Sequence, residues 1–137
     1  MLYSKLYEHF YSLRLKIANT FSDFFGFRPN LVYLSAIALI QVGSWWLAYY
    51  IFKHLTGNLL VLHYNVDFGI DWVGDLNLIF YFPLLGFLFL IVSVILLFIF
   101  GVGRHFRLQS HYLMAGVVLA NLGMLSALVL VYIINFR

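Results

Sequence analysis

The sequence predicts an all-α integral membrane protein. We expect an N-terminal amphipathic interfacial helix plus three transmembrane helices, with a short irregular or β-like outward loop between the first two spans. Hydrophobic residues make up 64% of the chain and charged residues only 9%, against about a quarter in soluble domains. With 137 residues and a mean hydropathy of +0.97, the chain holds more apolar surface than one small core buries. The lipid bilayer is therefore its first predicted partner.

Composition also excludes several classes of protein. The eight Lys and Arg residues are scattered, whereas a nucleic-acid-binding protein needs a basic face, so no nucleic acid is expected. The chain has no cysteine, which excludes disulfides and thiolate metal sites. Residues 1–27 have no apolar run followed by a small-residue cleavage site, so we expect the first span to act as an uncleaved anchor. Residues 1–137 form a single membrane domain in this interpretation.

Residues 1–27 predict the interfacial helix. Apolar side chains recur at helical spacing and polar side chains lie on the opposite side. An aromatic-rich apolar face with flanking Lys and Arg is typical of a helix at a membrane surface, and a groove on a soluble partner is the alternative. Gly26 and Pro29 then separate this helix from the next. The apolar positions are Leu2, Tyr3, Leu6, Tyr7, Phe10, Leu13, Ile17, Phe21 and Phe24.

Three apolar runs predict the spans, at residues 31–53, 78–102 and 112–136. Each is long enough to cross a hydrocarbon core of about 30 Å at about 1.5 Å per residue. Asp75 precedes the second run and is a candidate N-cap. Residues 103–111 are expected to form a short cytoplasmic turn.

Basic residues predict the orientation. The outward loop, residues 54–77, contains three Asp and no Lys or Arg, whereas the other side of the predicted bundle is basic. We therefore expect a multi-pass protein of the cell (inner) membrane, with a cytoplasmic N-terminus and the C-terminus outside. Lys53 and Arg137 are exceptions at helix ends, where side chains snorkel. The predicted cytoplasmic basic residues are Lys5, Arg14, Lys16, Arg28, Arg104 and Arg107.

Few residues within the spans are polar, and residues 31–52, 78–102 and 112–136 contain no charged group of the kind that pumps and proton relays need. Gln41, Ser93 and Asn121 are expected near the same depth, as interhelical hydrogen-bonding residues, with a substrate site as the alternative. A stripe of small residues in the third span allows close approach of another helix, from this chain, a second copy or another subunit. Its members are Gly116, Ala120, Gly123 and Ala127.

The outward loop is the most distinctive segment. Residues 59–66 are rich in β-forming types, and His63, Asn65 and Asp67 would share one face of an extended strand. The spacing matches no established calcium or zinc loop, so no metal and no cofactor are predicted. The simpler interpretation is that these side chains bond the loop backbone and cap turns. The recognition candidates are His63, Tyr64, Asn65, Asp67, Gly69, Asp71 and Asp75.

The segment Leu62-His63-Tyr64-Asn65, followed by Gly69-Ile70-Asp71 and Gly74, resembles a motif of small uncharacterised bacterial three-span membrane proteins. It is also distantly similar to the DUF1648 family, in which a Pro-x-His core precedes a Gly, an Asp and a transmembrane helix. This chain departs from that pattern because no proline lies two residues before His63. Some members of that group resemble immunity or signal-transduction membrane proteins. The resemblance implies an outward loop that senses or binds something, and no catalytic residues carry over.

Our leading functional hypothesis is a non-enzymatic accessory or structural membrane protein with residues 62–75 as its recognition surface. The sequence has no recognisable motif that combines a nucleophile with a base, so we do not expect an enzyme. One alternative is a ligand- or peptide-sensing or immunity-type membrane protein. Another is a small subunit of a respiratory or transport complex. Self-association and packing against other membrane subunits are both consistent with the small-residue stripe.

Overall fold

The computed structural model describes residues 2–65, 67, 69–100 and 105–136. Three of its helical segments, Arg28–His54, Leu76–Phe100 and Phe106–Phe136, are long and apolar enough to cross a membrane. The predicted span ends at 101–102, Arg104 and Arg137 lie outside the described residues. The elements are α1 (Leu2–Gly26), α2 (Arg28–His54), β1 (Leu59–Asn65), β2 (Gly69–Asp75), the 3₁₀ helix η1 (Leu76–Phe80), α3 (Tyr81–Phe100) and α4 (Phe106–Phe136).

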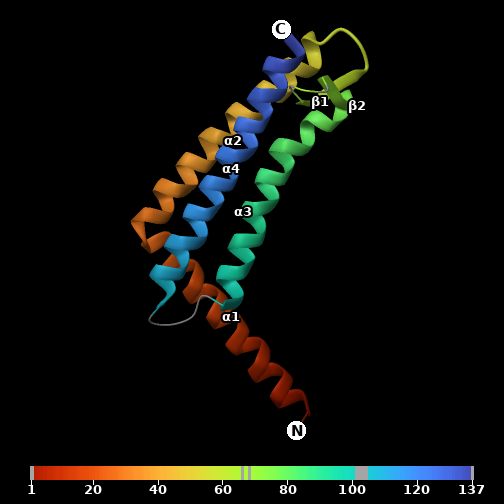
Figure 1. Cartoon of the computed structure of the whole chain (residues 1–137). Coiled ribbons are helices and arrows are strands. Elements are labelled where there is room, and N and C mark those ends of the chain that lie inside the picture. Colours follow the sequence, from red (N-terminus) through yellow and green to blue (C-terminus); the bar gives the residue numbers. More distant parts are fainter. Residues whose placement is uncertain (1, 66, 68, 101–104, 137) are drawn as a thin grey trace.

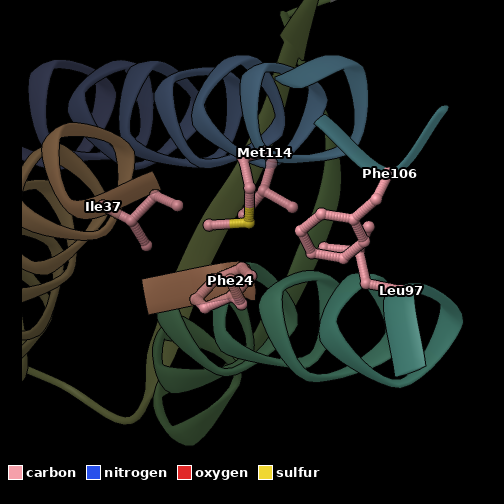
Figure 2. Close-up of a cluster of buried hydrophobic side chains, with 6 residues drawn as sticks. Phe24, Ile37, Leu97, Phe106 and Met114 are labelled. Atoms are coloured by element: carbon pink, nitrogen blue, oxygen red, sulfur yellow. The ribbon is translucent and has the colours of Figure 1, made fainter. Parts of the chain in front are cut away.

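The bundle is built around α4, which packs along both α2 and α3 (Figure 1). Only 17%, 17% and 22% of the three apolar windows is buried inside the protein, so most of their apolar surface is left for lipid. Two buried clusters hold the helices together. Figure 2 shows the first, at the end of the bundle nearest α1. It contains Phe24, Ile37, Leu97, Phe106, Met114 and Val117, and the second contains Ala48, Ile51, Leu60, Ile79, Leu128 and Val131.

The predicted turn at residues 103–111 is mostly helical, because α4 begins at Phe106. The apolar run underestimates this helix because polar residues before it continue the same helical turns. Ser110 is fully buried among them, and its hydroxyl donates to the Asn30 side-chain oxygen at 2.7 Å. Helix α4 therefore extends beyond its apolar run.

The segment between α2 and α3 is a two-stranded antiparallel hairpin, β1 and β2. Its base is closed by a hydrogen bond from the backbone N–H of Leu76 to the carbonyl oxygen of Asn58, at 3.1 Å. Asp75 is the N-cap of η1, and its side chain accepts from the backbone N–H of Asn77 at 2.8 Å. Gly69 has φ of +79°, a conformation that favours glycine where β2 begins.

The junction of α1 and α2 is fixed by a buried polar residue. Pro29 occupies the first turn of α2, and Asn30 follows it with no exposed surface. The Asn30 side-chain amide donates to the carbonyl oxygen of Phe24 at 2.9 Å, which holds the end of α1 against the bundle. Figure 1 shows α1 running out from this end of the bundle instead of folding back along it.

Candidate functional site

The hairpin is fastened to the helices at two points, so it is a rigid part of the fold. Leu60 of β1 has no exposed surface and packs between the helices with Ile79 and Leu128. The Asn135 side chain of α4 binds both backbone polar groups of Val61. Its amide donates to the Val61 carbonyl oxygen at 2.8 Å, and its oxygen accepts from the Val61 N–H at 3.0 Å. Asn135 therefore replaces a third strand beside β1.

Several large apolar side chains of the hairpin are exposed. Leu59 is 70% exposed, Trp72 64% and Ile70 57%, and Val73 is also exposed. Large apolar side chains that stand together outside a core commonly mark a surface for another protein or for a membrane. The hairpin thus combines a fixed backbone with exposed aromatic and aliphatic groups.

A hollow lies where the hairpin meets the start of α3. It measures about 410 Å³ and is lined by apolar groups with a few polar tips. Gly74 lies next to two of the residues that line the hollow. A Cβ at this position would lie 2.5 Å from Leu78 Cδ1 and 2.8 Å from Leu62 Cδ1. A side chain at residue 74 would therefore displace two of the lining leucines. The lining residues are Leu62, His63, Trp72, Leu78, Tyr81 and Phe82.

The predicted loop candidates occupy different parts of the hairpin. His63 is exposed and pairs with Trp72, while Tyr64 and Asn65 pair with Ile70 and Gly69. Register shifts occur on both sides of His63, and β1 ends at Asn65. The prediction that His63, Asn65 and Asp67 share one strand face is therefore wrong. Asp67 lies in the turn, and the register shifts beside His63 break the strict alternation of side chains.

The acidic candidates are separated as well. Asp71 lies within β2, and Asp75 ends it as the helix cap. Within the described part of the chain, no group of three or more His, Cys, Asp or Glu side chains has the arrangement of a metal site.

A second set of predicted residues meets inside the bundle. Gln41 and Asn121 are the central residues of α2 and α4. The Gln41 amide donates to Asn121 Oδ1 at 2.7 Å and to the carbonyl oxygen of Pro83 at 3.1 Å. The Asn121 amide donates to the carbonyl oxygens of Gly86 at 3.2 Å and Val117 at 2.9 Å. These bonds link all three spanning helices.

Helix α3 contributes a close contact that the sequence does not reveal. A Cβ on Gly86 would lie 2.5 Å from Asn121 Oδ1 and 2.7 Å from Gln41 Nε2. Ser93 lies roughly two helical turns further along α3 and is not among the hydrogen-bonded residues described for this cluster. Helix α3 thus takes part through backbone carbonyls and a glycine rather than through its serine.

The small-residue stripe of α4 is divided between exposed and partly buried positions. Gly116 and Gly123 are exposed, and a Cβ on either would meet no described atom within 4 Å. Ala120 and Ala127 are partly buried. Within the described residues, the two glycines do not mediate a helix contact of this chain.

Helix α1 contacts the bundle through one side only. Thr20 and Phe24 are buried, and Lys16 Nζ donates to the carbonyl oxygen of Ile99 near the end of α3 at 3.0 Å. From Tyr7 onward, the other large apolar side chains of α1 are exposed, and some of them line a shallow groove along the helix. That groove is lined by Phe10, Leu13, Arg14, Ile17, Ala18 and Phe21.

A scan against protein-family models gives no match, and searches of curated proteins and of solved structures give none either.

Proposed function

We propose that this chain is a non-enzymatic accessory protein of the cell membrane, and that its outward hairpin is a recognition surface. The observation that carries the proposal is the combination of rigid attachment and exposed apolar groups. Asn135 and Leu60 hold β1 on the bundle, while Trp72 and Ile70 of β2 are largely exposed. A surface that is already ordered loses less conformational entropy when it binds, which favours recognition.

The charge distribution supports the outward placement of the hairpin. The end of the bundle near α1 carries Arg14, Lys16, Arg28 and Arg107, and the hairpin segment contains Asp residues without Lys or Arg. Basic segments remain on the cytoplasmic side during insertion. The hairpin and the C-terminal end of α4 then face the outside.

Helix α1 has a separate place in this proposal. It lies in the cytoplasmic interface, with Phe10, Ile17 and Phe21 in the lipid and Ser12 and Asn19 in water. Its exposed apolar face and its fixed junction at Asn30 support this arrangement. A helix of this kind stabilises the tilt and depth of the bundle.

Site-specific photo-crosslinking in the native membrane tests recognition by the hairpin. A photoreactive amino acid replaces Ile70 or Val73, both exposed on β2, and the matched control replaces Leu119, which is exposed on α4. We expect a discrete crosslinked species from the hairpin positions and none of the same mass from residue 119. The same adducts from all three positions would show random collision and contradict a recognition surface.

A second candidate function, a small subunit of a larger membrane complex, is favoured by the exposed glycines of α4. Gly116 and Gly123 leave room for a close helix from outside the chain. In this case partner subunits should copurify with the protein in mild detergent, and Gly123→Leu should release them. Val129→Leu is the control, at an exposed position that is already bulky, and it should retain them. Unchanged partners in both variants would reject this function.

A further inference from the structure

We propose that the free edge of β2 pairs with a short, extended, basic segment of a partner protein, which adds a third strand to the hairpin. The inference rests on the recognition surface proposed above and states which kind of partner that surface takes. Three observations carry it: the backbone register of the hairpin, the open side of β2, and the charge of this strand.

The register of the hairpin determines which backbone groups of β2 point away from β1. In an antiparallel pair, residues opposite each other alternately exchange both hydrogen bonds and exchange none. Both backbone groups of Val61 bond the Asn135 side chain, so Val61 and its opposite residue Val73 form a non-bonded pair. The bond from Leu76 to Asn58 at the base of the hairpin fits the same alternation. The N–H and carbonyl groups of Val73 therefore point outward from the free edge.

The other side of β2 is open. The sheet has two strands, and in the described part of the chain no strand lies beyond β2. Strand β1 packs against α4 and η1, whereas the main neighbour of β2 is β1. Strand β2 contains neither the lysine nor the proline that commonly protects an edge from pairing, and Val73 is exposed. An extended polypeptide supplies the alternating donors and acceptors that match such an edge.

The regular part of this edge is short. Register shifts beside His63 confine regular pairing with β1 to the end of β2 that runs from Val73 to Asp75. A partner strand that follows the backbone there needs only a few residues. The exposed side chains of Trp72 and Ile70 lie directly beside it in the same strand.

Charge favours a basic partner over a second copy of this chain. Strand β2 contains Asp71 and Asp75, and residues 54–77 contain no Lys or Arg. In an antiparallel pair of two β2 strands centred on Val73, Asp71 of one copy would lie opposite Asp75 of the other. Like charges in opposite positions are destabilising, whereas a Lys or Arg opposite the exposed Asp75 is stabilising.

Amide hydrogen exchange of the protein in phosphatidylcholine nanodiscs tests the edge directly. Val73 should exchange freely, whereas Leu60, whose pair with Gly74 lies next to the non-bonded pair, should be protected. The probe is a capped peptide of alternating lysine and valine. It should slow exchange at Val73 about tenfold and leave Leu60 unchanged. A peptide with glutamate in place of lysine, and a lysine–valine peptide with every amide methylated, are the matched controls and should have no effect.

Each part of the inference has a result that overturns it. Protection of Val73 in the protein alone would show that the edge is already closed. An exchange rate at Val73 unaffected by the lysine–valine peptide would reject the added strand. Equal slowing by the glutamate peptide would contradict a basic partner, and equal slowing by the methylated peptide would contradict backbone pairing. Equal slowing by a peptide that copies residues 69–75 would assign the edge to a second copy.

A proline variant carries the test into the native membrane. Val73→Pro removes the outward N–H, and proline is tolerated in an edge strand where that group bonds no neighbour. Val73→Thr keeps the N–H and is the control. With the photoreactive amino acid at residue 70, the crosslinked species should disappear in Val73→Pro and remain in Val73→Thr. Amide exchange at Leu60 checks that the two strands stay paired in both variants.

This experiment separates the inference from the proposed function. Crosslinks retained in both variants would overturn pairing at the edge and leave the hairpin as a recognition surface. The absence of a discrete crosslink even with Val73 in place would reject the recognition surface itself. The peptide titration uses the unchanged chain, so its result stands if Val73→Pro also loosens the hairpin.

Discussion

At the residue scale, the fold depends on a few amides that link the helices of the bundle. An amide within the hydrocarbon has no water to bond, so it is stabilised by bonding a neighbouring helix, typically by ~0.6–2 kcal/mol. Gln41 and Asn121 do this at the centres of α2 and α4. Among the described residues, Gln41 Oε1 is the one buried side-chain nitrogen or oxygen atom without a hydrogen-bond partner. The amide pair joins α2 and α4 at their centres, and its bonds to the carbonyl oxygens of Pro83 and Gly86 add α3 to the same contact.

Gly86→Ala tests the close contact beside this pair. The added methyl would meet both amides at 2.7 Å or less, so the amides or the helix must shift. We expect a loss of about 1–3 kcal/mol in the free energy of unfolding. Titration of the reconstituted protein with a denaturing detergent measures it. Gly116→Ala is the matched control, because a methyl there meets no described atom within 4 Å. Equal stability of the two variants would contradict the packing at Gly86.

At the element scale, the hairpin depends on α4 for its position. Two strands alone are marginally stable, and a third partner is usually needed. Here the partner is the side chain of Asn135, together with the buried Leu60. The hairpin is therefore an extension of the helical bundle.

Asn135→Ala should loosen the hairpin without unfolding the spans. Two hydrogen bonds to Val61 are lost, each worth about 0.5–1.5 kcal/mol. We expect the Val61 amide to exchange its hydrogen about ten times faster, as measured by hydrogen–deuterium exchange in lipid nanodiscs. Ser126→Ala, which removes an exposed hydroxyl of the same helix, should leave this rate unchanged. A rate at Val61 unaffected by Asn135→Ala would show that the hairpin is held by other contacts.

Helix α1 allows a test of its proposed place in the interface. The chain has no cysteine, so a single introduced cysteine reports one position. A polarity-sensitive fluorophore on Phe10→Cys or Ile17→Cys should emit at shorter wavelength and be quenched by spin-labelled lipids. The same fluorophore on Ser12→Cys or Asn19→Cys should remain in water. Water exposure at all four positions in vesicles of the protein alone would assign this face to a protein partner instead.

At the scale of the whole molecule, the apolar runs were sufficient to predict the three spanning helices. A bilayer imposes a length and excludes charge, so both appear directly in the sequence. The break between α1 and α2 follows equally from Gly26 and Pro29, because these residues restrict the backbone locally.

The sequence is less informative where two distant segments meet. Nothing near Asn135 indicates that it binds Val61, which lies far earlier in the chain. The need for glycine at residue 86 depends on which amide lies beside it. Ser93 has the same polarity as its predicted partners, but its position along α3 places it away from them. Local rules give the elements, and only the packing of the helices gives these contacts.

The central claim is that the hairpin and the basic end of the bundle lie on opposite sides of the membrane, with the hairpin outside. Single-cysteine labelling with a membrane-impermeant maleimide tests it most directly, because the chain has no cysteine of its own. Asn58→Cys, beside the hairpin, should react in intact cells, and Gln109→Cys, at the start of α4, should react only after permeabilisation. The reverse pattern would place the hairpin in the cytoplasm and contradict the proposed recognition surface.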